Sequence, residues 1–131
     1  MKLSEYFQSS NGTGILATSN SSGQVDVAIY ARPHFIDEQT VAFIMKDGLS
    51  HENLQSNPHA AYLFVERGEG YQGRRLYLTK LTEETDPQKI DALRRRPLPA
   101  ECSAESGSRF LVHFHVDRVR PVVGDGQEAR R

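Results

Sequence analysis

Alternating apolar and polar residues in two segments of this chain, and short apolar runs in others, are typical of β-strands. Val25, Val27 and Ile29 occupy every second position, and the same spacing runs from Phe110 to Val116. Because side chains of a strand point alternately to its two faces, this spacing gathers apolar residues on one face. The pattern predicts strands over residues 15–18, 25–30, 40–45, 60–65, 76–81 and 109–119.

Two short helices are predicted from helical spacing and from start signals. Leu3 and Phe7 share one helical face, which predicts a helix within the first nine residues. Asp86 is a typical N-cap, and Pro87 suits the first helical position because a helix leaves that N–H unbonded. We expect this later helix to continue to Arg96.

A further short helix is predicted between the third and fourth strands. Ser50 is the expected N-cap, since its hydroxyl can accept a hydrogen bond from an amide of the first turn. Leu49 and Leu54 have the spacing of a hydrophobic staple, and Pro58 ends the helix. The strand, helix, strand unit from Thr40 to Glu66 is the clearest feature of the pattern.

The arrangement of these elements favours a curled sheet. Pro33 marks an edge or bulge because it cannot donate a hydrogen bond to a neighbouring strand. Six strands with three short helices leave the faces of a flat sheet poorly covered, whereas a barrel removes most of the edges. The predicted fold class is therefore mainly β (α+β), a six-stranded antiparallel β-barrel with short flanking helices.

Size and charge limit the functions that this chain can have. Its 131 residues suit one domain, and 16 Lys and Arg against 17 Asp and Glu give a net charge of -1. An electrostatic field that attracts nucleic acid or a membrane surface is therefore not expected. No apolar run approaches the roughly 20 residues needed to cross a bilayer, and no signal peptide is evident, so a cytoplasmic location is expected.

Five histidines suggest a metal site, but their spacing does not support one. His113 and His115 fall on the strand face opposite the apolar residues, where solvent or a subunit contact is the expected environment. His59 is expected at the surface. For His51 two interpretations stay open: an anion contact in the first turn of a helix, or a simple surface histidine.

The arginines and the single cysteine carry weaker signals. Three arginines at 94–96 suit the negative end of a helix, whereas Arg74 and Arg75 are expected at a barrel mouth or a subunit edge. Cys102 has no second cysteine for an intrachain disulfide and falls in a loop-like segment. ATP, NAD and serine-hydrolase sites are not expected, because phosphate-binding loops and a nucleophile elbow are missing from the sequence.

Three segments together resemble the FMN-binding split-barrel proteins related to pyridoxamine 5′-phosphate oxidase. They are Ala17-Thr18-Ser19 to Gly23 with the strand through Tyr30; Val41 to Met45 leading to Ser50-His51-Glu52-Asn53-Leu54 and Asn57-Pro58; and Arg75-Leu76-Tyr77-Leu78-Thr79-Lys80-Leu81. The resemblance implies a split β-barrel domain over residues 1–123 and a homodimer with FMN at the subunit interface. The terminal residues 124–131 are expected to form a flexible tail.

The resemblance also implies a cofactor site. Ile29, Tyr30, Ala31 and Arg32 would line the flavin, Phe43 and Ile44 would flank it, Lys46, Leu49 and Ser50 would surround its phosphate, and Arg75 would add a polar contact. Basic residues expected by this resemblance are replaced by Ala28, Leu49 and Ser50, so that Lys46, His51 or Arg32 would supply the charge for the phosphate.

The function implied is that of an FMN-dependent oxidoreductase acting on a small-molecule substrate. In such a protein the flavin carries the redox chemistry, and the chain orients and tunes it. The alternative is a non-catalytic storage, sensing or electron-transfer module that holds a flavin, a deazaflavin or haem. A barrel without any cofactor, acting as an interaction protein, is a third hypothesis.

Overall fold

The computed structural model describes residues 2–93 and 109–124, and within them the chain forms seven strands and three helices. The elements are, in order, α1 (Leu3–Ser9), β1 (Gly12–Ser19), β2 (Val25–Ile29), β3 (His34–Asp37), β4 (Thr40–Lys46), α2 (Leu49–Ser56), β5 (His59–Glu66), β6 (Gly73–Glu84), α3 (Pro87–Leu93) and β7 (Arg109–Arg120). The predicted mainly β architecture with short helices is confirmed.

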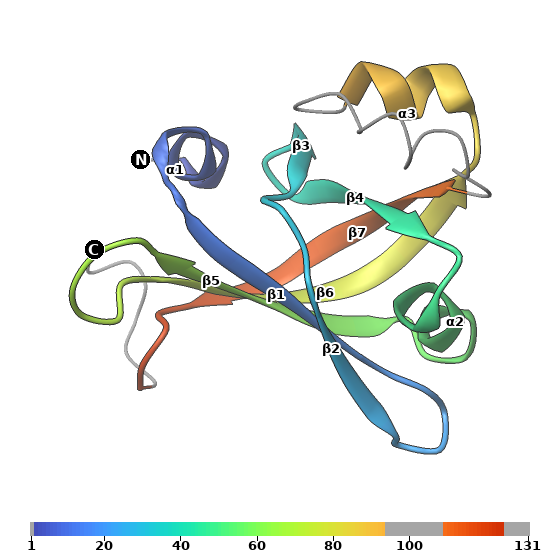
Figure 1. The fold of residues 1–131 in the computed structure, drawn as a ribbon, viewed down its shortest axis with the longest axis horizontal. Coiled ribbons are helices and arrows are strands. Elements are labelled where there is room, and N and C mark those ends of the chain that lie inside the picture. Colours follow the sequence, from blue (N-terminus) through green and yellow to red (C-terminus); the bar gives the residue numbers. More distant parts are fainter. Residues whose placement is uncertain (1, 94–108, 125–131) are drawn as a thin grey trace, which may run out of the picture.

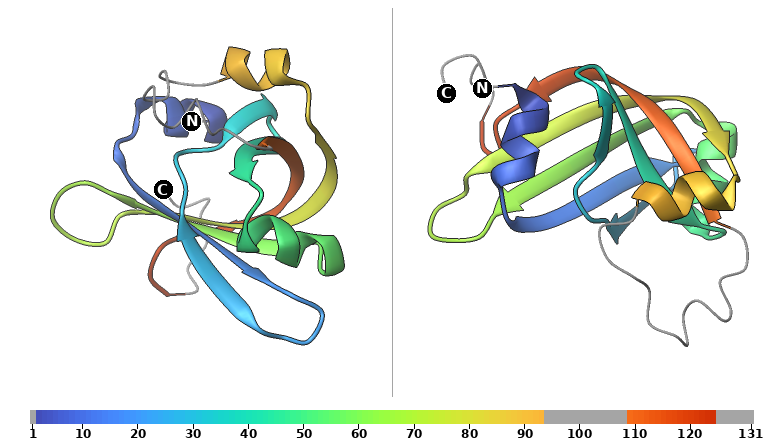
Figure 2. Two further views of the ribbon diagram at one scale, coloured as in Figure 1. Left: turned by 45° about the vertical axis from the view of Figure 1, so that its right-hand side comes forward. Right: turned by 90° about the horizontal axis from the view of Figure 1, so that it is seen from above.

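The strands pair antiparallel in the order β2-β1-β5-β6-β7-β4-β3. The sheet curls strongly, and Figures 1 and 2 show α1 and α2 near its opposite ends. Among the described residues no strand pairing joins β2 to β3 or β4, so hydrogen bonds do not close the barrel at this seam. The rings of Tyr30 and Phe43 meet edge to face, with centroids 5.9 Å apart, where the chain has just left β2.

The strand that the sequence pattern missed is β3. The predicted count of six strands is wrong, because the described residues contain seven. β3 has four residues, pairs only with β4 and is irregular between Phe35 and Asp37. Its residues are half-buried or exposed, so no alternation was available to reveal it. Pro33 precedes this edge strand, in agreement with the predicted edge position.

The inner face of the curled sheet forms the main core. Alternate residues of the strands are buried there, among them Leu16, Phe43 and Phe114, and α1 adds Tyr6 and Phe7. Burying one side chain of this size contributes roughly 1.5–3 kcal/mol to folding. The alternation that predicted the strands is thus the alternation between core and outer face.

The start of α2 differs from the prediction. The helix begins at Leu49 with Gly48 as N-cap, so the prediction of Ser50 as the cap is wrong. Leu49 is 53% exposed and occupies the first helical position, which also rules out the predicted staple with Leu54. The predicted end is confirmed, because α2 stops two residues before Pro58.

The starts of the other helices are confirmed. α1 covers Leu3–Ser9, and α3 begins at Pro87, where a carboxylate oxygen of Asp86 accepts the N–H of Gln88 at 3.0 Å. Ile90 of α3 packs on the outer face of the sheet, against Ala42 and Leu111. α3 therefore covers a second, smaller apolar cluster behind the barrel.

Some predictions lie outside the described residues. These are the extension of the third helix to Arg96, the placement of the arginines at 94–96, the loop position of Cys102, and the tail beyond Gly124.

Gly14 allows β1 to approach the chain that leaves β2. A Cβ at this position would lie 1.9 Å from the hydroxyl oxygen of Tyr62 and 2.5 Å from the carbonyl oxygen of Tyr30. The Tyr62 hydroxyl lies 3.1 Å from the carbonyl oxygens of both Tyr30 and Ala31. These contacts hold the segment after β2 against the core and so position the Tyr30 ring.

Candidate functional site

Tyr30 and Ser50 connect the seam of the sheet to the first turn of α2. The Ser50 side chain is buried and lies close to the Tyr30 phenol. Burial raises the pKa of Tyr30, and the interaction with the Ser50 hydroxyl opposes only part of that rise. Tyr30 is therefore a neutral phenol at physiological pH. The structure brings together two of the residues that the resemblance assigned to the flavin and to its phosphate.

The N-terminus of α2 offers backbone N–H groups and one nearby cation. The first N–H groups of a helix have no partner within the helix, and a Cβ on Gly48 would meet nothing within 4 Å, so the N-cap borders open space. Lys46, Asp47 and Glu52 are all exposed here. One ammonium and two carboxylates therefore surround these N–H groups, and this balance of charge suits a phosphate only weakly.

Lys46 and Ile44 lie on the outer side of β4. Phe43 and Met45 point into the core, so the residues that alternate with them face outward. Arg109 is opposite Lys46 in the β4–β7 register and therefore shares its face. A long lysine side chain at the last position of β4 can still reach the turn that precedes α2.

A cross-strand row connects Ile29 to Arg75 on the outer face of the sheet. Ile29 lies opposite Ile15. Ile15 lies opposite Leu63, and Leu63 lies opposite Arg75. Opposed residues share a face, and neighbouring strands are about 4.8 Å apart, so Ile29 and Arg75 share one face at a separation of roughly 14 Å. Tyr30, the next residue after Ile29, points to the inner side instead.

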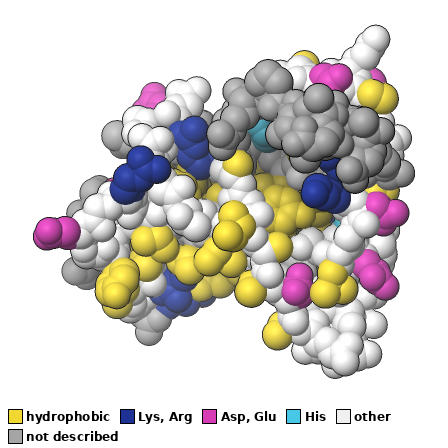
Figure 3. Space-filling model, viewed as in Figure 1, with side chains coloured by type: hydrophobic (Ala, Val, Ile, Leu, Met, Phe, Trp, Pro, Cys, Tyr) yellow, Lys and Arg dark blue, Asp and Glu magenta, His cyan; other side chains and the backbone are white. Residues whose placement is uncertain are grey.

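The edge strand β2 exposes an apolar row. Val25, Val27 and Ile29 are 80%, 66% and 79% exposed. Half-exposed apolar residues of β1 and β5 extend this row, and we define the β2 face as Val25, Val27, Ile29, Ile15, Ala17, Ala61 and Leu63. Figure 3 shows hydrophobic side chains gathered over β2 and in the hollow beside it. Exposed apolar patches of this kind mark binding or assembly surfaces.

The guanidinium groups of two arginines donate hydrogen bonds to backbone carbonyl groups. Arg32 donates from Nη1 to the carbonyl oxygens of Phe7 at 2.8 Å and of Ser10 at 2.7 Å, so it ties the segment after β2 to the end of α1. Arg75 donates from Nε to Pro121 at 2.7 Å. In this structure both guanidinium groups brace the fold, and neither lies at the start of α2.

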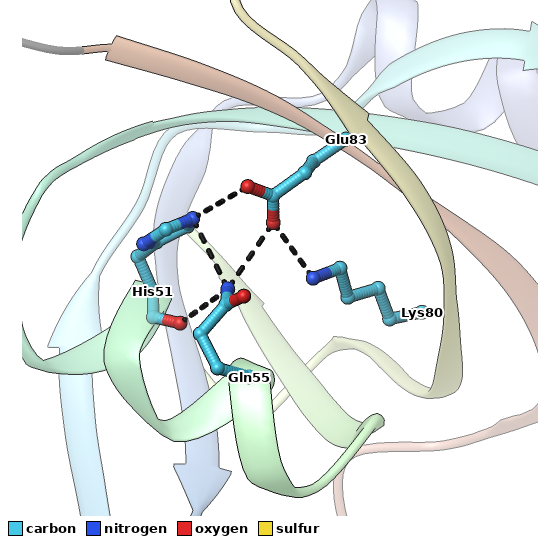
Figure 4. A network of polar contacts seen from close by, with 4 residues as sticks. All are labelled: His51, Gln55, Lys80 and Glu83. Atoms are coloured by element: carbon cyan, nitrogen blue, oxygen red, sulfur yellow. Dashed lines mark hydrogen bonds and ion pairs between the residues drawn. The ribbon is translucent and has the colours of Figure 1, made fainter.

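A network of four polar residues lies under α2 at the end of the barrel interior (Figure 4). His51 Nε2 is 2.9 Å from Glu83 Oε2. Lys80 Nζ is 2.7 Å from Glu83 Oε1, and the Gln55 amide nitrogen is 3.2 Å from that same oxygen. Burial raises the pKa of Glu83, but the hydrogen bonds from Lys80, His51 and Gln55 outweigh it and lower the pKa to about 2.

A bulge in β6 makes this network possible. Residues three apart in a regular strand face opposite sides, yet Lys80 is opposite Phe114 and Glu83 is opposite Val112, both core residues. The register shifts between Lys80 and Thr82, so Leu81 is an extra residue that returns Glu83 to the inner face.

Sequence reasoning missed Gln55, Lys80 and Glu83, and it left two interpretations open for His51. The hypothesis of a simple surface histidine is wrong, because His51 is buried and stacks on Phe110. The sequence contains no signal for the bulge, which is the feature that turns Glu83 toward His51. The side chains of Glu83 and His51 meet only because β6 pairs with β7 in this shifted register.

The remaining histidines lie on the outer side of the sheet. His113 is largely buried, with Nε2 2.8 Å from a Glu84 oxygen, so solvent is not its main environment. His115 is exposed and lies 2.7 Å from Asp117, and His59 is exposed as predicted. Within residues 2–93 and 109–124 no three His, Cys, Asp or Glu residues are arranged to hold a metal ion.

Comparisons with solved structures identify proteins of the same architecture. An FMN-binding protein from Syntrophomonas wolfei has a TM-score of 0.73 at 14% identity, covering 94% of this chain and 85% of that one. HupZ of Group A Streptococcus has a TM-score of 0.69 at 19% identity, covering 95% and 94%. An F420 reductase has a TM-score of 0.68 at 17% identity, covering 91% and 97%.

A protein of the pyridoxinephosphate oxidase family from Clostridium acetobutylicum also matches, with a TM-score of 0.64 at 14% identity over 90% of this chain and 84% of that one. The chain has the split-barrel fold. The likeness to pyridoxamine 5′-phosphate oxidase-like proteins that the sequence suggested is thereby confirmed for the fold. No family model and no curated protein sequence matches the chain.

None of the helices in the described part of the split barrel has the length and hydropathy that crossing a membrane requires.

Proposed function

We propose that this split-barrel chain is a flavin-binding protein that forms a homodimer and holds FMN between the β2 face and the start of α2. The observation that supports the proposal is the exposed apolar row of Val25, Val27 and Ile29 beside the Tyr30–Ser50 pair. A flat isoalloxazine ring requires apolar surface with few polar contacts. Proteins of the same fold, which include an FMN-binding protein and an F420 reductase, support a flavin-type cofactor.

The residues present fit the ring better than the phosphate. The β2 face and the neutral Tyr30 phenol suit the ring, whereas the phosphate would rely on backbone N–H groups of α2 and on Lys46. Asp47 and Glu52 oppose a dianion at the same place. We therefore expect the ring and its side chain to contribute most of the binding free energy.

The proposed activity is flavin-dependent oxidation or reduction of a small molecule, with no nucleic acid or membrane partner. Bound FMN supplies the redox chemistry. The chain would bind and orient the flavin, and the apolar β2 face would exclude water from one side of the ring. A cytoplasmic location is part of this proposal.

A second copy of the chain is the proposed cover of the β2 face. A stable interface buries about 800 Å² on each partner, and a row of exposed apolar side chains on an edge strand is a typical centre for one. Ile29→Asp should convert a dimer to a monomer in light scattering after gel filtration. Ile36→Asp, on the opposite edge strand, is the matched control, because Ile36 is 50% exposed and lies outside the β2 face.

Purified protein tests the cofactor directly. Flavin absorption bands in the preparation, or quenching of flavin fluorescence on titration of the apoprotein, would support the proposal. The absence of quenching at tens of micromolar FMN would reject it in favour of an interaction protein. The second candidate is a non-catalytic carrier of the cofactor, and a Soret band would indicate that it holds haem instead of a flavin.

Lys46→Ala tests the phosphate end. Loss of one charge-assisted contact, worth about 1.5–3 kcal/mol, should weaken FMN roughly tenfold or more while leaving riboflavin unchanged. Equal losses for FMN and riboflavin would place the phosphate elsewhere.

A further inference from the structure

His51 is held in one orientation by two contacts. Its ring stacks on Phe110, with centroids 3.7 Å apart and an interplanar angle of 11°. Its Nε2 lies 2.9 Å from Glu83, and the side chain is 10% exposed. Turning the ring by half a revolution would keep the stacking but lose the hydrogen bond to Glu83. The position of each ring nitrogen is therefore defined.

The charge of Glu83 decides where neutral His51 carries its proton. With a pKa of about 2, Glu83 is an ionised carboxylate at neutral pH, and an ionised carboxylate only accepts hydrogen bonds. Nε2 must therefore be the protonated nitrogen. In a neutral imidazole the other nitrogen then carries the lone pair, so Nδ1 is a hydrogen-bond acceptor.

Nδ1 of His51 is available to a ligand. The polar contacts of the His51 ring within the described residues all involve Nε2, which donates to Glu83 at 2.9 Å and lies 3.1 Å from the Gln55 amide nitrogen without accepting from it. A fully buried Nδ1 without a partner would count among the buried unsatisfied atoms of the described residues, and it does not. Part of the Nδ1 surface is therefore accessible. Figure 4 shows it turned away from Glu83. His51 belongs to the first turn of α2, whose N-cap Gly48 borders open space.

We propose that His51 Nδ1 accepts a hydrogen bond from a hydroxyl group of the bound small molecule, and that Glu83 is the positioning residue that fixes this acceptor. The inference rests on the proposed flavin function, in which the hydroxyl belongs to the sugar-alcohol chain between ring and phosphate. A phosphate dianion carries only acceptor oxygens and does not match an acceptor nitrogen. His51 therefore contacts the hydroxyl chain, while the backbone N–H groups of α2 face the phosphate.

The proton position is tested by ¹⁵N NMR of the full chain labelled on histidine. The His51 resonances are assigned by their loss in His51→Phe, a variant that keeps an aromatic ring against Phe110. We expect the proton on Nε2 in the wild type and a shift of the proton population toward Nδ1 in Glu83→Gln. Glu84→Gln, which affects the His113 pair, is the matched control and should leave His51 unchanged. A proton on Nδ1 in the wild type would overturn the inference.

The ligand contact is tested with riboflavin and with lumiflavin, which has the same ring but a methyl group in place of the hydroxyl chain. Riboflavin should move the His51 Nδ1 resonance, and lumiflavin should not. His51→Phe should weaken riboflavin roughly tenfold and leave lumiflavin within a factor of two. If riboflavin binds with no change at Nδ1 and no loss in His51→Phe, the inference is wrong and the flavin function stands. If neither flavin binds the wild type, the flavin function fails and the hydroxyl contact fails with it.

Discussion

Two adjacent glutamates of β6 make similar bonds on opposite faces of the sheet. On the inner face, Glu83 lies 2.9 Å from His51 Nε2 and 2.7 Å from Lys80 Nζ; on the outer face, Glu84 lies 2.8 Å from His113 Nε2 and 2.7 Å from Lys89 Nζ. The surroundings differ, because the side chain of Lys80 is 15% exposed and that of Lys89 is 59% exposed. Equal contact distances therefore do not imply equal contributions, since water screens the Lys89–Glu84 pair more than the Lys80–Glu83 pair.

The largest expected effect is the loss of the inner carboxylate. Glu83→Ala should lower the free energy of unfolding by about 1–3 kcal/mol, because Lys80 and His51 would keep their burial without an acceptor. Glu84→Ala is the matched control and should cost less, because only one of its two partners, His113, is largely buried, whereas both partners of Glu83 are. Urea unfolding of both variants measures the difference. Equal losses would contradict the distinction between the two faces.

Lowering the pH should reduce the contribution of Glu83 to folding stability over a defined pH range. The pKa of Glu83 falls from 4.5 to about 2 on folding, so its contribution is complete above pH 4.5 and is lost as the pH falls toward 2. The pKa of Glu84 is lowered too, by Lys89 first and then by His113, which gives the same sign. Glu83→Gln should flatten the decline of the urea midpoint between pH 5 and pH 2 more than Glu84→Gln does, and a reversed order would contradict the comparison.

Replacing the lysine partner of each glutamate tests the same comparison with a smaller expected change in stability. Lys80→Met removes a partner of Glu83 from a mostly buried position and should reduce stability by about 1 kcal/mol. Lys89→Met removes an exposed partner of Glu84 and should produce no measurable change at 0.5 M salt. Thermal unfolding of the two variants at low and high salt checks both statements. A salt-sensitive loss in Lys80→Met would mean that water reaches the inner pair.

The smallest effect is expected from removing the bulge. Deleting Leu81 takes out the extra residue of β6, so Lys80, Glu83 and Glu84 keep their present faces in a regular strand. The variant should fold and should retain the His51 tautomer in the NMR experiment. Deleting Leu63 from the regular strand β5 is the control, because a one-residue slip there reverses every following side chain and should abolish folding. If both deletion variants fail to fold, the assignment of Leu81 as the extra residue of the bulge is wrong.

Local pattern was enough for the parts of the fold that depend on neighbours in sequence. Alternation and short apolar runs predicted six of the strands, and proline and N-cap residues located the end of α2 and the start of α3. β3 was missed because it is short and only half-buried, so its stability comes from pairing with β4. The cap at Ser50 was mispredicted because the extended backbone of Gly48 lets the helix begin one residue earlier, at Leu49, without a side-chain cap.

The candidate site divides in the same way. Ile29, Tyr30 and Ser50 were selected from the sequence, and the structure places Tyr30 against Ser50 while turning Ile29 to the outer face. Arg32 was selected for its charge, but its guanidinium is bound to carbonyl groups at the end of α1. Charge is visible in a sequence, whereas the partner that a charged group finds is decided by the packing around it.

By itself, the sequence determined the mainly β architecture, the three helices and the apolar residues of the core, because each follows from the period of side chains along one segment. Tertiary structure alone decided that β6 would bulge at Leu81, that Glu83 would meet His51 and that Val27 would stay exposed on the β2 face. These outcomes depend on pairing between distant strands and on which faces find a cover, and no local period encodes either one.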